Sequence, residues 1–146
     1  MKAVRFAIDQ EEFFGNPDVP KCRVTADKRI ADLEAGNHLL YNQVGTAVVG
    51  YRSYVDGSVQ PFQISTPKNL DPAKPMPLMI WLHGRAESET DIYFITSREG
   101  GGRGNISLDN AINIQAFGRN CLGFKAAGEV DVLECIASAK KRYSIG

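Results

Sequence analysis

The stretch Pro77-Leu-Met-Ile-Trp-Leu-His-Gly-Arg85 joins five consecutive apolar residues to an abrupt His83-Gly84 exit. Five apolar residues suit a β-strand and are too few for a helix, and their lack of alternation is typical of a parallel strand buried on both faces. Ala111-Ile-Asn-Ile-Gln-Ala-Phe117 is a second candidate inner strand, and Gly118 marks its exit. The sequence therefore predicts two inner strands of a sheet.

Helical patterns follow both strands. Ser88-Glu-Thr-Asp91 is suited to cap a short helix through Ile92, Phe94 and Ile95. Residues 128–143 predict a longer helix, because acidic residues gather near its start and basic residues near its end, which complements the helix dipole. We expect its apolar face to comprise Val130, Leu133, Ile136, Ala137 and Tyr143, and its early carboxylates Glu129 and Asp131 to stabilise the dipole.

A hairpin is predicted upstream. Residues 46–55 and 58–66 are rich in β-branched and aromatic side chains, and Asp56-Gly57 between them suits a turn that needs a positive φ. Pro61 lacks an N–H group, so the second of these strands is expected at a sheet edge or a bulge. Four prolines in residues 67–77 then predict a turn-rich connection.

These elements predict an α/β fold in three layers, with an antiparallel hairpin followed by parallel strands and flanking helices. Residues 1–44 are expected to form an irregular segment with one short helix around Ile30 to Leu40, weakened by Gly36. Residues 45–146 are expected to form the α/β domain.

Composition narrows the classes of protein. The chain has 146 residues, and 43% of them are hydrophobic. Because 17 basic side chains balance 17 acidic ones, no long-range electrostatic field favours binding to nucleic acid or to an anionic membrane surface. No signal-like or membrane-spanning run is present in the sequence. Three widely spaced cysteines are typical of reduced thiols. We expect a cytoplasmic protein.

Several motif-like features have simpler explanations. The two histidines, His38 and His83, lack the neighbours of a metal site, so neither a metal nor another cofactor is expected. Residues 118–125 lack the Lys-Ser/Thr of a phosphate loop, and the glycines of residues 100–104 lack the spacing of a dinucleotide fingerprint. Cys121 is interpreted as a packed thiol because no histidine lies in a recognisable constellation with it.

Three stretches together resemble the α/β-hydrolases, and more narrowly the prolyl-oligopeptidase-like serine hydrolases, which include peptidases and esterases. They are Gly50-Tyr-Arg-Ser-Tyr-Val-Asp-Gly-Ser-Val-Gln-Pro-Phe62, Leu78-Met-Ile-Trp-Leu-His-Gly-Arg85, and Phe117-Gly-Arg-Asn120 continuing through residues 124–132. They occur in the order of the family, whose Gly-x-Ser-x-Gly nucleophile motif is absent from these 146 residues. The resemblance implies the N-terminal part of such an enzyme, a truncated α/β-hydrolase-like domain.

The resemblance also implies roles for individual residues. His83, Gly84 and Arg85 would form an oxyanion loop, with the Arg85 backbone N–H as donor and His83 as a structural residue that holds the loop. A strand-end histidine bonded to backbone is the simpler explanation for that imidazole. Arg119 and Asn120 are weaker candidates for lining the pocket.

Without nucleophile, acid and base, the chain is expected to be inactive alone, and a completed enzyme would take a peptide or a small ester. The alternative is a small α/β binding or interaction module that uses an exposed sheet edge. In the family's strand order the neighbour of strand 78–82 would begin just past Gly146. We therefore also expect an unpaired edge there, with self-association through it.

Overall fold

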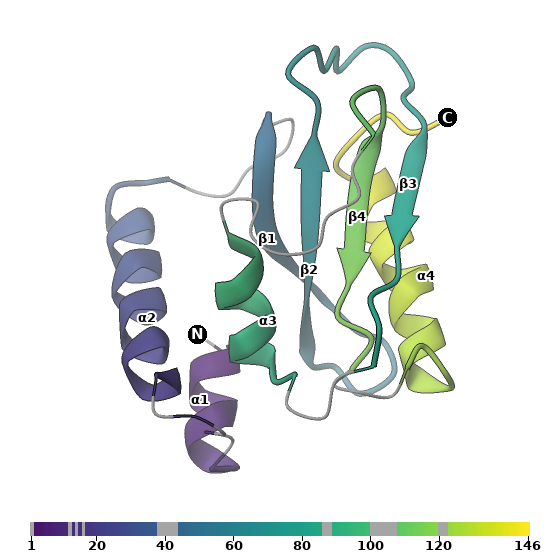
Figure 1. Cartoon of the computed structure of the whole chain (residues 1–146). Helices are drawn as coiled ribbons and strands as arrows, with labels where there is room; N and C mark the ends of the chain where they lie inside the picture. The colour runs from purple at the N-terminus through teal and green to yellow at the C-terminus, as the bar shows by residue number, and fades with distance from the viewer. Residues whose placement is uncertain are drawn as a thin grey trace.

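The computed structural model describes residues 2–11, 13, 15, 17–37, 44–85, 89–99, 108–119 and 123–146. Within those ranges one mixed four-stranded sheet lies between helices (Figure 1). The elements in chain order are α1 Lys2–Asp9, α2 Asp18–Glu34, β1 Gly45–Arg52, β2 Val59–Thr66, β3 Leu78–Trp81, α3 Asp91–Arg98, β4 Ile112–Ala116 and α4 Ala127–Lys140. No helix in this part of the chain has the length and apolar composition to cross a bilayer.

The strands lie in the order β1-β2-β4-β3. β1 and β2 form the predicted antiparallel hairpin, and β2 pairs antiparallel with β4, with Ile64 opposite Ile114. β3 pairs parallel with β4, with Ile80 opposite Ile114. The predicted combination of an antiparallel hairpin and parallel strands is confirmed.

Helices cover the two faces of the sheet. α4 packs on one face, against β1, β2 and β4, while α3 packs on the other and contacts α1 and α2 (Figure 1). The predicted short helix is α3, whose N-cap residue Thr90 accepts a hydrogen bond from the Tyr93 N–H at 3.1 Å. The three-layer α/β class is confirmed.

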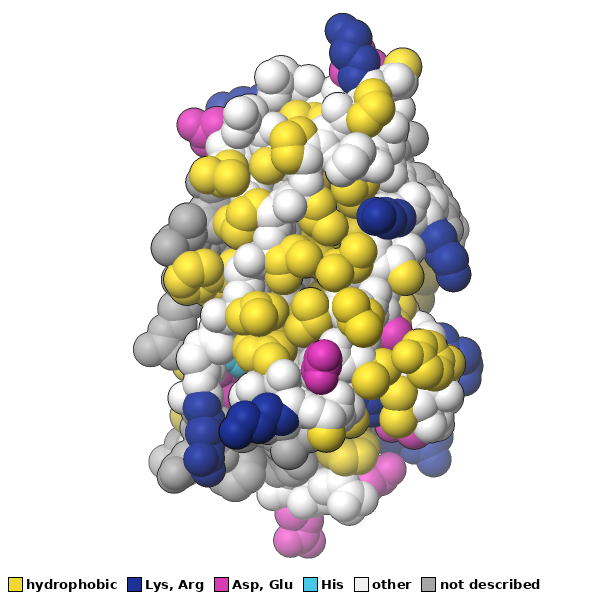
Figure 2. Space-filling model, turned by 90° about the vertical axis from the view of Figure 1, so that its right-hand side faces the viewer, with side chains coloured by type: hydrophobic (Ala, Val, Ile, Leu, Met, Phe, Trp, Pro, Cys, Tyr) yellow, Lys and Arg dark blue, Asp and Glu magenta, His cyan; other side chains and the backbone are white. Residues whose placement is uncertain are grey.

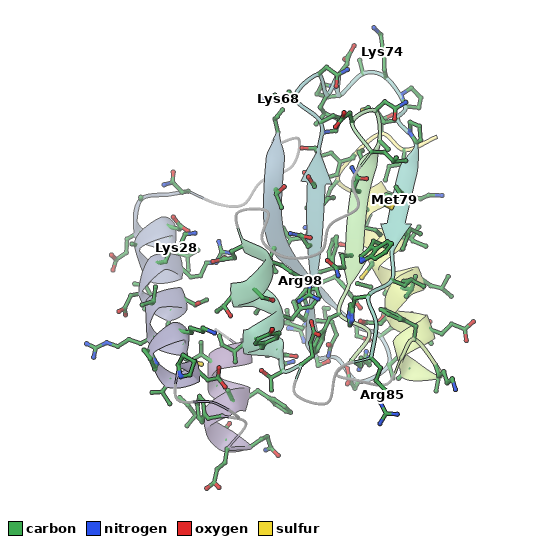
Figure 3. The ribbon with its side chains drawn as sticks, in the orientation of Figure 1. Lys28, Lys68, Lys74, Met79, Arg85 and Arg98 are labelled. Carbon is green, nitrogen blue, oxygen red and sulfur yellow. The ribbon has the colours of Figure 1, made fainter. Side chains whose placement is uncertain are left out.

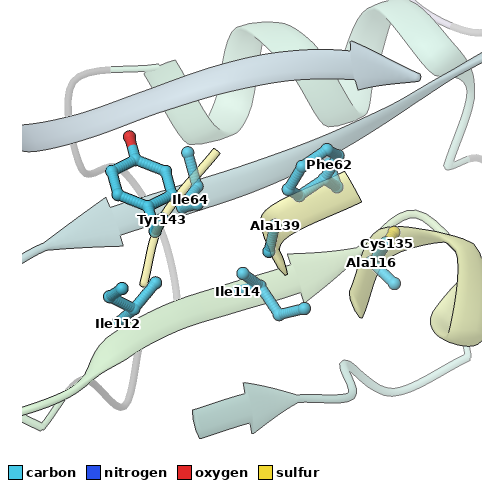
Figure 4. Packing of buried hydrophobic residues seen from close by; sticks show 8 residues of the cluster. All are labelled: Phe62, Ile64, Ile112, Ile114, Ala116, Cys135, Ala139 and Tyr143. Atoms are coloured by element: carbon cyan, nitrogen blue, oxygen red, sulfur yellow. The ribbon is translucent and has the colours of Figure 1, made fainter. Parts of the chain in front are cut away.

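The main core lies between the sheet and α4. Alternate residues of β2 and β4 point to this face, as the period of two in a strand requires, and meet small residues of the helix (Figure 4). The cluster comprises Phe62, Ile64, Ile112, Ile114, Ala116, Cys135, Ala139 and Tyr143. A smaller cluster on the opposite face holds Val48, Phe94 and Phe117.

Two expectations about the hairpin are wrong. β2 lies inside the sheet and not at its edge. The last residue of β2 that pairs with β4 is Phe62, opposite Ala116, so Pro61 lies just beyond that ladder. The missing N–H of Pro61 therefore costs no hydrogen bond to β4. β1 ends at Arg52, earlier than residue 55, and Ser53, which follows it, is buried. Gly57 adopts a positive φ of 71° in the longer turn that results.

The N-terminal segment is more helical than predicted. α1 and α2 occupy most of its described residues, and the helix expected around Ile30 to Leu40 is the end of α2, which stops at Glu34. Residues 38–43 lie outside the described ranges. Ala7 and Cys22 pack on Ile92, so both helices are joined to α3. The division of the chain at residue 44 stays a prediction.

The buried face of α4 also differs from the prediction. Leu133 is 58% exposed, whereas Asp131 is fully buried and Glu134 nearly so. The residues that face the sheet are Gly128, Asp131, Cys135 and Ala139. Ile136 and Tyr143 of the predicted face do pack on the core, whereas Leu133 and Ala137 are exposed. The two carboxylates bind partners beneath the helix, as described below.

β3 is parallel as predicted but is not buried on both faces. It is the edge strand of the sheet, and each of its four residues is partly exposed. Its outer side is occupied just before the strand begins, where Met76 forms an isolated parallel bridge with Ile145.

Candidate functional site

The carboxyl ends of β3 and β4 lie at the same edge of the sheet because the two strands are parallel. Residues 82–85 leave β3 and residues 117–119 leave β4, so the two exits are neighbours. In open α/β sheets this edge is where ligands bind. The candidate site therefore consists of these two exits and the side chains that hold them.

His83 joins the two exits. Its Nδ1 lies 2.8 Å from the Gly84 carbonyl oxygen and its Nε2 lies 3.1 Å from the Phe117 carbonyl oxygen. The ring packs between Phe94 and Phe124, at centroid distances of 6.1 and 5.1 Å. A neutral imidazole carries one N–H, so the ring donates a hydrogen bond to one of these two carbonyl oxygens, and its position between the two exits suits a residue that holds the loop.

Gly84 and Arg85 are exposed beyond this anchor. A Cβ added to Gly84 would meet no atom within 4 Å, so the fold itself has room for a side chain there. Figure 3 shows the Arg85 side chain projecting away from the body of the molecule. Both residues of the loop are therefore accessible at the edge of the sheet.

The β4 exit is tightly packed around Gly118. Its φ is +70°, and a Cβ at this position would lie 2.7 Å from the Phe124 ring. Glycine is thus required here both by the backbone conformation and by the close aromatic neighbour. Phe124 in turn contacts His83, so the two exits share one packing unit.

Asp131 fixes the same exit from beneath. Its carboxylate accepts hydrogen bonds from the Gly118 N–H at 2.9 Å and from the Tyr51 hydroxyl. Burial raises the pKa of Asp131, an effect that the bonds from Tyr51 and Gly118 and the charge of Arg119 oppose. Burial also raises the pKa of Tyr51, which keeps it a hydrogen-bond donor.

Glu134, one turn further along α4, binds the hairpin loop. It accepts hydrogen bonds at 2.7 Å from both the Ser53 hydroxyl and the Tyr54 N–H. Together Asp131 and Glu134 tie α4 to the β1–β2 turn and to the β4 exit. These bonds offset the cost of removing two carboxylates from water.

Arg119, a predicted pocket-lining residue, points its guanidinium into this acidic group. It donates to Asp56 at 2.7 Å and to the Ser53 hydroxyl, and lies within 3.9 Å of both buried carboxylates of α4. Burial alone would lower the pKa of Arg119, but the hydrogen bond and charge of Asp56 outweigh it and raise the pKa. The pocket-lining role stays a prediction for Arg119.

The other predicted residues cannot be placed. Asn120 and Cys121 lie outside the described residues, as do His38 and the glycines of residues 101–104. Within the described ranges no group of three or more His, Cys, Asp or Glu side chains is arranged to hold a metal ion.

Sequence reasoning missed the buried carboxylates and assigned Asp131 to the helix dipole. One signal was available. Asp131 lies three residues after Gly128, four before Cys135 and eight before Ala139, so it shares a helix face with small residues that suit close contact with a sheet. A carboxylate on such a face indicates a buried hydrogen-bonded group.

Comparison with solved structures gives a partial likeness. The crystal structure of a thermostable esterase matches with a TM-score of 0.50 and 18% sequence identity, over 69% of this chain and 32% of the esterase. The CE1 ferulic acid esterase AmCE1/Fae1A from the anaerobic fungus Anaeromyces mucronatus matches with a TM-score of 0.41 and 16% identity, over 69% of this chain and 44% of the esterase. No protein-family model and no curated protein matches the sequence.

The likeness to the thermostable esterase concerns the fold, and it makes the three-layer arrangement α/β-hydrolase-like. This chain spans about a third of that esterase's length.

Proposed function

We propose that this chain is the N-terminal part of a prolyl-oligopeptidase-like serine hydrolase, acting on peptides or carboxylic esters by acyl transfer through a serine ester. Its contribution is the oxyanion loop of residues 83–85. The observation that supports this role is the position of the loop, at the carboxyl edge of parallel strands in an α/β-hydrolase-like fold, with its first residue bonded to the neighbouring exit at Phe117.

In the proposed reaction a serine oxygen attacks the acyl carbon while its proton passes to a base. The carbonyl oxygen becomes an oxyanion, and the Arg85 N–H donates a hydrogen bond to it. The alcohol or amine then leaves with a proton, and water hydrolyses the serine ester in a second addition. The open space beside Gly84 lets the acyl group approach the backbone closely.

The chain alone should lack this activity. Its sequence has no Gly-x-Ser-x-Gly motif, and both nitrogens of His83 face backbone carbonyl oxygens. We place the protein in the cytoplasm, which agrees with Cys22 and Cys135 being free thiols.

Two proteins test the proposal: this chain, and one lengthened by the residues encoded beyond codon 146. Each is incubated with a fluorophosphonate probe and with a short-chain nitrophenyl ester. We expect labelling and turnover only in the lengthened protein. Turnover by this chain alone, or no labelling of either protein, would contradict the proposal.

The role of Arg85 has its own test in the lengthened protein. Arg85→Pro removes the backbone N–H, and we expect kcat to fall by about 10²- to 10³-fold, as with loss of one oxyanion donor. Arg85→Ala keeps the N–H and removes only the exposed guanidinium, so it is the matched control and should retain most of the activity. Equal losses in both variants would assign the effect to the side chain.

A second candidate function is a binding module that uses the edge of the sheet. The observation that favours it is the position of β3, which is the edge strand and is apolar throughout. Failure of both proteins to label would shift weight to this function.

A further inference from the structure

A cleft with a volume of about 150 Å³ lies between the N-terminal helices and the hairpin. Its lining comes from α1, α2, α3, β1 and β2, and Figure 1 shows the three helices on the side of the sheet where β1 lies. Val48 packs against Phe94 of α3, so Gly50, two residues further along β1, shares the face that α3 covers. The cleft therefore lies on the face of the sheet opposite α4 and the main core.

Gly50 keeps space open in this cleft. A Cβ built on Gly50 would lie 3.0 Å from Cγ1 of Val59, another residue of the lining. Pro61, which pairs with Gly50 across the hairpin, also lines the cleft. A larger side chain at position 50 would occupy part of the open space, so the volume of the cleft depends on this glycine.

Most of the lining is apolar. Ala3 and Val4 of α1, Ile92 and Ile95 of α3 and Val59 of β2 all contribute to it. Val4 and Ile95 are partly exposed and Val59 is 39% exposed, so a ligand can reach the cleft from solvent. Apolar walls offer water few hydrogen-bond partners, and an apolar ligand that replaces this water is favoured.

The charged residues described in the lining are Lys2, Arg29 and Asp91, and each forms an ion pair. Lys2 pairs with Asp91, whose side chain is 8% exposed. Arg29 pairs with Glu99, and its Nη1 lies 3.6 Å from a carboxylate oxygen of Asp32. An ionic ligand would have to displace one of these partners and leave a partly buried charge unpaired, which is costly. The charges therefore favour a ligand without charge.

We propose that this cleft binds a compact, uncharged apolar group about the size of a benzene ring. An apolar cavity of about 150 Å³ is large enough to hold benzene. The ring would lie over Gly50 and against Ile92 and Ile95, and the ion pairs would stay intact. This inference does not depend on the proposed hydrolase function, because the described lining includes none of residues 83–85.

Three probes that share one phenyl ring test the size and the charge of the ligand. Benzyl alcohol is neutral, benzoate is an anion and benzylammonium is a cation. Each is titrated into the unmodified chain while the methyl chemical shifts of Val48, Ile92 and Ile95 are followed by NMR. We expect saturable shifts with benzyl alcohol, and a dissociation constant about tenfold lower than for either ion, because only the ions must displace a charged partner.

A second apolar surface has to be distinguished from the cleft. Figure 2 shows a broad patch of hydrophobic side chains on the side of the molecule where β3 and α4 lie. Leu82, which follows β3, and Leu133 of α4 are 46% and 58% exposed, so their methyl groups report adsorption of the probe there. We expect Ile92 and Ile95 to respond at lower concentrations of benzyl alcohol than Leu82 and Leu133. The reverse order would overturn the proposal.

Two variants that fill the cleft come from different elements. Gly50→Val adds a side chain at the floor, and Ala3→Leu enlarges a residue of α1 that is 6% exposed. Each should raise the dissociation constant of benzyl alcohol about tenfold, because the ring and the added atoms cannot occupy the same space. Ala47→Val is the control, since residue 47 lies on the opposite face of β1, and it should leave the affinity unchanged.

Charge variants test the role of the ion pair. Lys2→Met leaves the Asp91 carboxylate without its cation, so the affinity for benzylammonium relative to benzyl alcohol should rise about tenfold. Asp91→Asn leaves Lys2 without its anion and should raise the relative affinity for benzoate in the same way. Circular dichroism confirms that each variant is folded.

Three results would overturn the proposal. They are the absence of saturable shifts at Ile92 and Ile95, binding of either ion to the unmodified chain as tightly as benzyl alcohol, and folded cleft-filling variants that bind benzyl alcohol as well as Ala47→Val does.

Discussion

The Nε2 atom of His83 lies 3.1 Å from the Phe117 carbonyl oxygen, which joins the loop after β3 to the exit of β4. The same ring contacts Phe94 and Phe124, so one side chain joins α3, both strand exits and the segment before α4. The geometry of the candidate oxyanion loop therefore depends on packing across the whole carboxyl edge of the sheet.

Replacing His83 tests this link. We expect His83→Ala to lower the free energy of unfolding by about 2 kcal/mol, since both the ring contacts and the hydrogen bond from the ring to the backbone are lost. His83→Phe keeps an aromatic ring and should lose about half as much. Urea unfolding, followed by circular dichroism, measures both losses. Equal losses would show that the ring contacts contribute little.

The buried carboxylate of Asp131 should matter more. Asp131→Ala leaves the Gly118 N–H and the Tyr51 hydroxyl without an acceptor, and we expect a loss of about 3 kcal/mol in the free energy of unfolding. Glu129→Ala is the matched control, because Glu129 is an exposed carboxylate in the first turn of the same helix. It should cost no more than about 1 kcal/mol. Similar losses in the two variants would mean that Asp131 acts only on the helix dipole.

The contrast between these two carboxylates shows how far the sequence could predict the fold. The apolar run at 78–82, the strand-like segment 111–117 and the Asp56-Gly57 turn are local patterns, and each predicted its strand or turn to within a few residues. The burial of Asp131 depends on Tyr51, which lies 80 residues away. No local pattern contains that partner, so the prediction of the buried face of α4 included Ile136 and Tyr143 correctly but left out Asp131.

In the candidate site, too, the local pattern predicted the position of an element but not its distant partners. A strand that breaks into His83-Gly84 predicted where a loop would form, and the loop lies at the end of β3. The partners that hold it, Phe117 and Phe124, are joined to it only by the tertiary fold. The acidic partners of the Arg119 guanidinium come from the hairpin and from α4, so no pattern local to Arg119 contains them, and its pocket-lining role stays a prediction.

Gly118 offers a test of close packing. Gly118→Ala must adopt a positive φ and also displace the Phe124 ring, so we expect a loss of about 2 to 4 kcal/mol in the free energy of unfolding. Gly57→Ala is the control, because Gly57 has nearly the same φ, +71°, with no atom within 4 Å of the added Cβ. It should cost about 1 kcal/mol, the conformational penalty alone. Chemical denaturation of both variants gives the difference, and equal losses would rule out a steric role for Phe124.

Asp56 should make stability depend on pH in the acid range. Hydrogen bonds from the Ser58 hydroxyl and N–H, with help from Arg119, lower the pKa of Asp56 to about 2, from an ordinary value of 3.8. A carboxyl whose pKa is lowered by folding contributes stability that is fully present above 3.8 and is lost as the pH falls toward 2. The difference in unfolding free energy between the natural chain and Asp56→Asn should therefore shrink over that window.

Ser58→Ala is the companion variant for this pH dependence. It removes the hydroxyl that bonds Asp56 while leaving the carboxyl and the backbone N–H in place. The acid-side loss of stability should then be smaller than in the natural chain and larger than in Asp56→Asn. Urea midpoints at several acidic pH values give all three curves, and parallel curves would show that Asp56 is not linked to folding.

The thiols provide a test of local stability. Cys135 is fully buried beneath α4, and burial raises the pKa of its thiol, so the reactive thiolate is scarce in the native state. Cys22 lies in the smaller cluster between α1, α2 and α3, where burial also raises the thiol pKa. α1 has only eight residues, and we expect this cluster to open more often than the main core. Iodoacetamide labelling in native buffer, resolved by peptide mass spectrometry, should modify Cys22 before Cys135. Modification of Cys135 at the rate of an unfolded chain would mean that the core between α4 and the sheet is not formed.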